Sequence, residues 1–599
     1  MTQDAPNHTS PLAPGARIAV GPHTLELVAP VHSEVLSRRW SARDVDTDRP
    51  VDVLFRAPGQ RSGPLLDDTD STLSGFAVER HGWDHGESVM LFDMSGTRPL
   101  ADYVPPLPRP AELEPDDEAT CHARWSLAIH LCEYFEILHE IGEVLVVHAD
   151  LDSFVVRQRE GRVEVLYRRP ELLFQRNAPP RPGSYQGTGY DAPEVTGLLS
   201  REIDTRADVF MLGMLLYTLF TGVRARPGTE AIADRLPVVR SFDPHIPFGV
   251  DACVRRALAR TPSGRHAAVE DVRQELEAAF AAAPGRKLVG EDQRIWVNWG
   301  SSSEIGHHKM ERYPVNQDAV LQLFDPAVTW GLFAVMDGVS RSDIGTGELA
   351  SWVARTTLEE GWNLKRNTPI YGRVFEGESP YPENVLQKLA ELAHTRIFRW
   401  LELLMLTPEA VPGTRAMATT LSAVGIFRNR AAVCSVGDSP LYLVRLGASP
   451  ETSDVEQLNI EQNVALHGLK RGVDPVEALT NPAAASLAWA LGKIAWRGNP
   501  LKPMCPRILI ELSSFRLHPG DLLLVCSDGV PDAFGESAHQ DMLNVLHPLL
   551  VGRVDSANEA VLTAAARALV READRRGGRD NLTTMLVAIG DVRDDGAAD

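Results

Sequence analysis

The chain has 599 residues, of which 44% are hydrophobic and 24% are charged, and its formal net charge is -21. A chain of this length exceeds what one hydrophobic core usually supports, so at least two domains are expected. The excess of acidic residues argues against nucleic acid or an anionic membrane surface as the main partner.

The sequence also predicts a cytoplasmic protein. The N-terminus lacks a basic segment followed by an apolar run, so it does not resemble a secretory signal. The most apolar stretch, 209–223, is shorter than a membrane span and predicts a buried helix. The six cysteines form no CxxC pair, which indicates reduced residues in the core.

In chain order, residues 1–16 are rich in Pro, Ser and Asn and predict a disordered tail. Short strand-like runs such as "HTLELVAP" follow up to about residue 110, separated by turn residues. Apolar residues at helical spacing then predict helices at 118–142, 205–221, 251–259 and 266–283. Strands followed by helices predict an α+β domain over 17–283, with a small β lobe and a larger α lobe.

Residues 284–292 continue a Pro-Gly and charged stretch and predict a linker. Beyond it, strand-like runs alternate with helical stretches near 346–364, 383–404 and 556–575. This pattern predicts a second, α/β domain over 293–592, a plausible size for one domain.

Five aspartates of the second domain lie at or near the ends of strand-like runs: Asp318, Asp337, Asp438, Asp528 and Asp580. A single Asp-Gly pair usually marks a turn. The order and the flanking strands of all five instead favour a site for Mg²⁺ or Mn²⁺, which prefer oxygen ligands. A pair of such ions can lower the pKa of a shared water and direct it at a phosphorus atom.

These aspartates lie in an ordered series of motifs: "NQD", "VMDG", "GELAS", "ATTLSAV", "VGDSP", "DLLLVCSDG" and "GRDNLTT". Over about 295–590 the series resembles the metal-dependent serine/threonine protein phosphatases of the PPM, or type 2C, family. The resemblance implies a sandwich of two antiparallel sheets flanked by helices and two or three bound Mn²⁺ or Mg²⁺ ions. It also implies hydrolysis of phosphoserine or phosphothreonine in a protein substrate by metal-activated water.

By the same resemblance, Asp337 bridges two ions and the carbonyl of Gly338 binds the second of them. Asp528 and Asp580 hold the first ion, and Asp438 joins Asp528 at a third. Asp318 orients metal-bound water, which makes it a catalytic candidate together with Asp337.

The sequence departs from the family in three places. Tyr313 stands where the family has a phosphate-binding arginine, which leaves Arg312, Lys309 and His308 as candidates for that role. No histidine follows Asp337, so no histidine acid is expected, and Pro440 stands where arginine is common. None of these changes removes a predicted metal ligand.

The first half resembles protein kinases, which implies a bilobal kinase-like fold. His148 and Asp150 occupy two positions of the H-R-D motif, and Glu194 ends an A-P-E motif. Asp208 begins the buried helix that follows, and Arg265 is placed to pair with Glu194.

Most of the kinase chemistry is absent from this half. The segment 28–40 has no glycine for a phosphate-binding loop. Kinases also carry a lysine on a strand that binds the α- and β-phosphates, and Arg56, the only basic residue near that position, is not at the expected place. Val155 replaces the expected asparagine, and 167–169 reads Tyr-Arg-Arg where Asp-Phe-Gly is expected. The sequence therefore predicts a pseudokinase in which Asp150 holds a loop rather than acting as a base.

The preferred interpretation is an active bacterial signalling phosphatase, regulated or targeted by an inactive kinase-like domain that binds a client. A bifunctional kinase–phosphatase and a non-catalytic signalling scaffold are the alternatives. Mn²⁺-dependent activity separates the first interpretation from the scaffold.

Overall fold

The computed structural model describes most of the chain, as two compact units. One unit comprises 1–106, 116–233 and 253–276, and the other comprises 107–115, 234–252 and 277–599. The described ranges are 13–30, 38–56, 78–82, 88–107, 118–141, 143–159, 162–169, 172–243, 246–286, 293–327, 329–366, 382–404, 414–497, 502–535 and 538–591. Most of the predicted tail, part of the 28–40 segment and most of the predicted linker lie outside these ranges. No helix among the described residues is long and apolar enough to cross a membrane.

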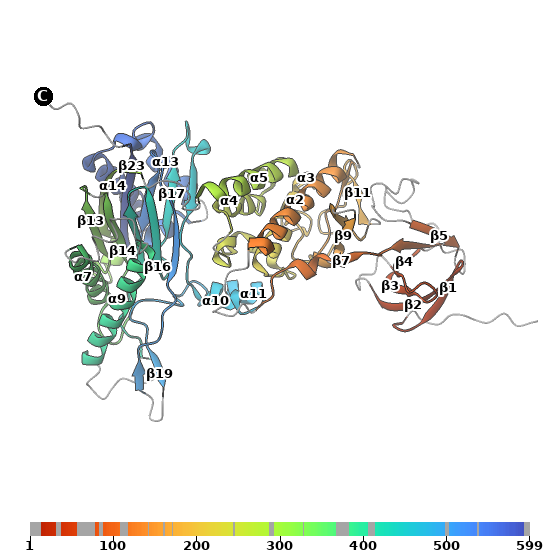
Figure 1. The fold of residues 1–599 in the computed structure, drawn as a ribbon, viewed down its shortest axis with the longest axis horizontal. Helices are drawn as coiled ribbons and strands as arrows, with labels where there is room; N and C mark the ends of the chain where they lie inside the picture. The colour runs from red at the N-terminus through yellow and green to blue at the C-terminus, as the bar shows by residue number, and fades with distance from the viewer. Residues whose placement is uncertain are drawn as a thin grey trace, which may run out of the picture. The chain divides into compact units, whose positions relative to one another are not determined.

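The first unit begins with a six-stranded antiparallel sheet in the order β1-β2-β3-β4-β6-β5 (Figure 1). The strands are β1 (Arg17–Val20), β2 (His23–Pro30), β3 (Arg38–Asp44), β4 (Pro50–Arg56), β5 (Val78–Gly82) and β6 (Ser88–Asp93). Alternate residues of β4, namely Val51, Val53 and Phe55, enter the core of this sheet. Because side chains alternate along a strand, Asp52 and Leu54 face the other way.

Helices follow the sheet along the chain, as the sequence predicts: α2 (Glu118–Glu140), α3 (Thr205–Thr221), α4 (Phe248–Ala257) and α5 (Val269–Arg286). The start of α4, up to residue 252, and the end of α5, from residue 277, are assigned to the second unit. Helix α3 is buried from Ala207 to its last residue, which explains its continuous apolar sequence. Asp204 caps its first turn by accepting from the backbone of Arg206, and Gly222 ends it in the left-handed region. Short strands complete this part: β7 (Thr97–Pro99), β8 (Val144–Leu145), β9 (Phe154–Arg159), β10 (Arg162–Tyr167) and β11 (Phe174–Gln175).

The second unit contains two five-stranded antiparallel sheets. The first has the order β12-β23-β22-β17-β18, from β12 (Trp296–Ile305), β23 (Asn581–Gly590), β22 (Leu522–Cys526), β17 (Leu441–Arg445) and β18 (Asp454–Gln457). The second has the order β13-β14-β15-β16-β21, from β13 (Ala319–Asp325), β14 (Trp330–Met336), β15 (Leu421–Phe427), β16 (Arg430–Val436) and β21 (Glu511–Arg516).

Three apolar layers hold this unit together. The middle layer lies between the sheets and includes Phe333, Val433 and Leu523. Helices α7 (Gly347–Arg366) and α9 (Pro382–Leu404) cover the β13–β16 sheet, whereas α12 (Gly529–Phe534), α13 (Ala538–Leu550) and α14 (Glu559–Arg576) cover the β22–β23 sheet. The second unit is therefore a sandwich of two antiparallel sheets flanked by helices, as expected.

The prediction missed the 13-residue helix α13 and several short elements. Helices α10 (Val464–Lys470) and α11 (Pro475–Thr480) and the hairpin of β19 (Ala495–Arg497) and β20 (Lys502–Met504) were not expected. Cys132, Cys253, Cys434 and Cys526 are free and buried, and Cys505 is free and half-buried, in line with the prediction of reduced cysteines.

Candidate metal centre

The five predicted aspartates lie at corresponding ends of their strands. Asp337 follows β14 and Asp318 precedes β13, and the antiparallel register that pairs Ala319 with Met336 brings them to one edge. Asp528 follows β22 and Asp580 precedes β23, where Cys526 pairs with Thr584.

Side chains join these two edges across the sandwich. Thr583 Oγ1, on β23, donates to Asp318 Oδ2 at 2.6 Å. Asp438 follows β16, whose Val436 pairs with Leu421, and the adjacent Thr420 donates its N–H to the carbonyl of Asp337 at 2.8 Å. The structure thus brings carboxylates from both sheets to one end of the sandwich.

The backbone at Asp337 is held by the "TT" of the "ATTLSAV" motif. Thr419 Oγ1 donates to the carbonyl of Asp337 at 2.9 Å, and Asp337 N donates to Thr420 Oγ1 at 3.0 Å. At Gly338, a Cβ would lie 2.4 Å from the carbonyl oxygen of Gly347, in the "GELAS" motif. The glycine is therefore required by close backbone packing and not only by a turn.

Burial and neighbouring charges raise the pKa of Asp337, Asp318 and Asp528. Burial raises the pKa of Asp337 well above its usual range, and the charges of Asp318, Asp528 and Asp580 add to this effect. Burial also raises the pKa of Asp318 to about 6, against the opposing hydrogen bond from Thr583. The pKa of Asp528 is raised by burial and then by the charge of Asp580. Several buried like charges in one place need a cation to be stable in the ionised form.

Asp438 belongs to the same group. Its pKa is raised well above the usual range by burial, then by the charges of Asp528 and Glu461. Its Oδ1 is buried and has no hydrogen-bond partner among the described residues. An unsatisfied carboxylate oxygen surrounded by other carboxylates fits a hard divalent cation, so the donor set suits Mg²⁺ or Mn²⁺.

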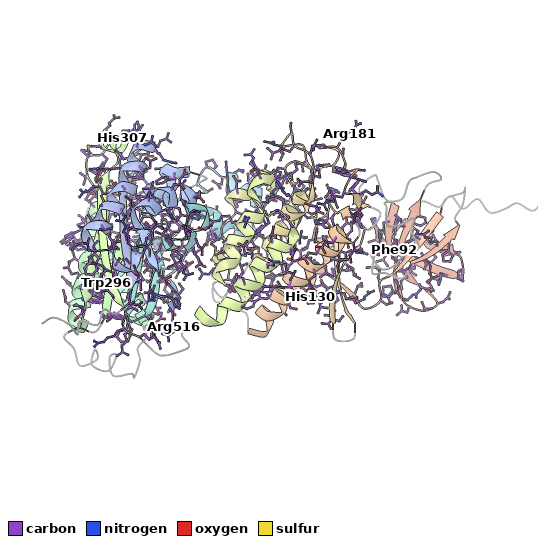
Figure 2. The ribbon with its side chains drawn as sticks, turned by 90° about the horizontal axis from the view of Figure 1, so that it is seen from above. Phe92, His130, Arg181, Trp296, His307 and Arg516 are labelled. Atoms are coloured by element: carbon purple, nitrogen blue, oxygen red, sulfur yellow. The ribbon has the colours of Figure 1, made fainter. Side chains whose placement is uncertain are left out.

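Of the three candidates for phosphate binding, Lys309 alone contacts the aspartate set among the interactions described. It lies on the short helix α6 (His307–Met310), whose first residue is labelled in Figure 2. The buried Lys309 ammonium contacts Asp580 Oδ1 and donates to Ser340 Oγ at 2.8 Å. The side-chain amide of Asn581, in the orientation that satisfies both partners, accepts from Lys309 Nζ at 3.0 Å.

The other two candidates have different surroundings. His308 bonds through its ring to the carbonyl of Gly577, and Arg312 is exposed. Tyr313 stands where the family has an arginine. Its hydroxyl lies 3.3 Å from each carboxylate oxygen of Glu348.

Two acidic residues near the set were not predicted. The charges of Glu461 and Asp532 both act on Asp438 to raise its pKa. Asp532 lies one turn after Asp528 on α12. The i,i+4 spacing of Asp528 and Asp532 could have indicated that both lie on one face of a helix. No such local pattern in the sequence pointed to Glu461.

The kinase-like residues of the first unit form a structural network. Asp208 accepts from the backbone N–H groups of Val146 and Val147 at 2.9 and 2.7 Å. Glu194 and Arg265 form a buried bidentate pair with distances of 2.6 and 2.9 Å.

The two H-R-D positions belong to the same network. His148 is buried and bonds through Nδ1 to Asp191 at 3.0 Å. Asp150 caps the 3₁₀ turn Leu151–Ser153 by accepting from the backbone and hydroxyl of Ser153 at 3.0 and 2.7 Å. The contacts of Asp150 with Ser153 are those of a residue that holds a loop.

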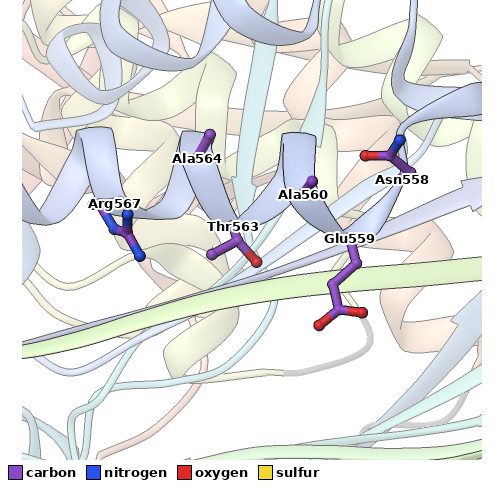
Figure 3. Close-up of a pocket in the computed structure, with 6 residues that line it drawn as sticks. All are labelled: Asn558, Glu559, Ala560, Thr563, Ala564 and Arg567. Carbon is purple, nitrogen blue, oxygen red and sulfur yellow. The ribbon is translucent and has the colours of Figure 1, made fainter.

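An open cavity of about 570 Å³ lies elsewhere in the second unit (Figure 3). It is lined by Asn558, Glu559, Ala560, Thr563, Ala564 and Arg567, at the start of α14. This 18-residue helix is about 27 Å long, and Asp580 follows its opposite end. The cavity is therefore not part of the candidate metal centre.

Known proteins of two kinds resemble parts of the chain, although no family model matches it. The kinase Pkn1 of Myxococcus xanthus is 29% identical over 253 residues, which cover 39% of this chain and 34% of Pkn1. The chain thus spans about a third of the length of that relative. The protein phosphatase PhpP of Streptococcus pneumoniae is 25% identical over 244 residues, which cover 41% of this chain and 80% of PhpP.

Among solved structures, the catalytic domain of the serine/threonine phosphatase PstP was determined with two manganese ions. It is 22% identical, with a TM-score of 0.33, and the match covers 50% of this chain and all of that domain. Homologues of the chain therefore include serine/threonine protein kinases and PPM-type serine/threonine phosphatases, and the chain combines both kinds of sequence in one polypeptide.

Proposed function

We propose that the second unit is an Mn²⁺- or Mg²⁺-dependent phosphatase that acts on phosphoserine or phosphothreonine in proteins. The observation that carries the proposal is the convergence of carboxylates from both sheets, where burial and neighbouring charges raise the pKa of Asp337 and of Asp528. The similarity to PhpP supports the reaction class.

The residues of the set have distinct proposed roles. Asp337, Asp528, Asp580 and the carbonyl of Gly338 hold two ions, and Asp438 contributes to a third. Bound ions supply Lewis acidity, which lowers the pKa of a water and neutralises charge on the phosphoryl group.

The chain's own polar groups do the remaining work. Asp318, fixed by Thr583, orients the attacking water and accepts a hydrogen bond from it. Lys309 binds a phosphoryl oxygen, because it is the cation in contact with Asp580 and it lies beside Ser340.

The first unit is proposed to be kinase-like without kinase activity. Tyr167 stands where a metal-binding aspartate is expected, and the guanidinium of the next residue, Arg168, binds Asp52 of β4 through two bonds of 2.5 and 2.6 Å. Arg39 of β3 donates to the same carboxylate at 3.2 Å and stacks 4.1 Å from the ring of Phe92, which is labelled in Figure 2.

This arrangement is unfavourable for Mg²⁺-ATP. Asp52 and Arg39 are almost completely buried, so the carboxylate is committed to the two guanidinium groups. Removing either partner to admit a nucleotide would leave a buried charge uncompensated. The unit therefore acts by binding a client or regulating the phosphatase rather than by phosphate transfer.

Substitution of Asp337 in the full-length protein tests the phosphatase. Asp337→Asn is expected to abolish Mn²⁺-dependent hydrolysis of an aryl phosphate and of a phosphoserine peptide. Asp325→Asn, at the opposite end of β13, is the matched control and should retain activity. Retained activity in Asp337→Asn would disprove the assignment, and absence of Mn²⁺ binding by the unsubstituted protein would favour the scaffold.

Calorimetric titration of full-length Asp337→Asn with Mg²⁺-ATP tests the first unit. No Mg²⁺-dependent nucleotide binding is expected. Binding accompanied by phosphate transfer to a general kinase substrate would instead support the bifunctional enzyme.

A further inference from the structure

A cluster of imidazole and carboxylate groups lies in the sheet of the first unit, apart from the kinase-like motifs. It joins β2 to β5, which are not neighbours in the sheet order. The sheet curls so that β5 returns to the β1–β2 turn, where Gly21 has a φ of +56° and a Cβ would lie 2.3 Å from the ring of His81. Glycine at this turn therefore admits the imidazole ring.

Three potential metal ligands meet at this place. One ligand atom each from His23, Glu79 and His81 lies within 4.8 Å of the other two. Glu79 Oε2 lies 2.9 Å from His23 Nε2 and 3.6 Å from His81 Nε2. Both imidazoles therefore approach the same carboxylate oxygen.

The surrounding groups orient these ligands. His23 Nδ1 bonds at 2.8 Å to Asp44, whose side chain is 1% exposed, which directs Nε2 toward Glu79. Arg49 donates to the other oxygen of Glu79, Oε1, at 3.3 Å and leaves Oε2 facing the imidazoles. A histidine ligand whose second nitrogen bonds to a carboxylate is the usual arrangement around protein-bound zinc.

His81 supplies an independent observation. Its Nε2 atom is buried and has no hydrogen-bond partner among the described residues. A buried ring nitrogen without a hydrogen-bond partner destabilises the fold unless it binds a ligand. This nitrogen lies near Glu79 Oε2, the same oxygen that contacts His23 Nε2.

We propose that His23, Glu79 and His81 form a binding site for Zn²⁺ or a similar divalent transition-metal ion. Two imidazoles and a carboxylate match the ligand types and number of three-residue zinc sites, in which water completes the coordination. The bound ion fastens β5 to β2 and closes the curled sheet. This site is independent of the proposed phosphatase, because none of its residues belongs to the aspartate set.

The test uses the full-length protein with Asp337→Asn, which weakens metal binding by the aspartate set. Zn²⁺ retained after dialysis is measured by elemental analysis, and Co²⁺ is used as a visible probe. One ion per chain is expected, and Co²⁺ should give the intense bands of a four-coordinate site with nitrogen ligands rather than the weak bands of a six-coordinate oxygen site.

Variants in this background locate the ion. His81→Ala is expected to lose the ion and the intense Co²⁺ bands, and Asp44→Asn should weaken binding about 10- to 100-fold. His130→Ala, on α2 of the same unit, is the control and should change neither. Glu79→Gln, of nearly the same size, repeats the test if His81→Ala fails to fold by circular dichroism.

Two outcomes would overturn the proposal. One is retention of the ion and of the Co²⁺ bands in both His81→Ala and Glu79→Gln. The other is the absence of a tightly bound ion in the parent protein, which would make His23 a protonated bridge between Asp44 and Glu79.

Discussion

At the scale of single residues, Lys309 distinguishes this site from the arginine expected in the family. The Lys309 ammonium, on α6, contacts Asp580 of the aspartate set. Arg312 is exposed, and none of its described contacts involves that set. Lys309→Met should lower kcat/KM for a phosphopeptide by about 100-fold or more, the usual cost of losing a group that stabilises the transition state. Steady-state kinetics in saturating Mn²⁺ measures the effect.

Arg312→Met is the matched control for this prediction. It removes a cation from the same segment and should change kcat/KM by less than about threefold, because exposed charges contribute little. A larger loss in Arg312→Met than in Lys309→Met would assign phosphate binding to the arginine.

Asp528 illustrates the cost of gathering carboxylates. Its pKa is raised by burial and by the charge of Asp580, so the ionised form is less favourable in the folded than in the unfolded chain. For such a group, stability is lost as the pH rises through the folded-state pKa. At pH 7 in a chelator, Asp528→Asn should therefore raise the melting temperature, by about 2–4 °C for each kcal/mol of relieved repulsion.

The same substitution should have the opposite effect in Mn²⁺. The ion stabilises the wild-type protein because it binds the folded state, and Asp528→Asn loses that contribution. Differential scanning fluorimetry in both conditions gives the comparison. If Asp528→Asn melts above the wild type in both chelator and Mn²⁺, or below it in both, the assignment of Asp528 as a metal ligand is contradicted.

At the scale of elements, the contact of β12 with α14 positions the start of β23 and thus Asp580. A Cβ at Gly300 would lie 2.2 Å from the backbone nitrogen of Thr563, so the strand and the helix touch through their backbones. Gly300→Ala should destabilise the second unit by about 1–3 kcal/mol, because the helix must move away. Chemical denaturation measures the loss.

Gly468→Ala provides the contrast for Gly300→Ala. Gly468 lies inside α10, and its Cβ would meet only ordinary contacts of 3.7 Å or more. Alanine favours the helix there, so the change should be neutral or slightly stabilising. Equal destabilisation by both substitutions would refute the packing argument.

Some helices with clear apolar periodicity were predictable from the sequence, whereas other elements were missed, including the 13-residue α13 and the 10-residue β12. Helix α14 was expected near 556–575 and spans Glu559–Arg576, because its apolar residues repeat at helical spacing. Helices α10 and α11 have seven and six residues, too few for a periodic pattern to be recognised.

The candidate sites show the same limit. The aspartates closely precede or follow strands and could be found from their motifs. Lys309 could be named only as one of three candidates, because its contact with Asp580 joins residues 271 positions apart. The approach of His81 to His23 depends on the curl of a sheet, for which the sequence gives no local signal.

At the scale of the whole molecule, the two units contain separate hydrophobic cores. Proteins with several domains commonly unfold in more than one step. Calorimetry of the full-length protein should resolve two transitions. Mn²⁺ should raise the transition of the second unit, because the aspartate set lies entirely within that unit.

Zn²⁺ should raise the other transition, because His23, Glu79 and His81 all lie in the first unit. A ligand at 100 times its dissociation constant stabilises the state that it binds by about 2.7 kcal/mol, enough for a shift of several degrees. His81→Ala should remove the response to Zn²⁺ and preserve the response to Mn²⁺, whereas Asp337→Asn should do the reverse. A single transition that both ions shift equally, in both variants, would show that neither ion acts through its proposed ligands.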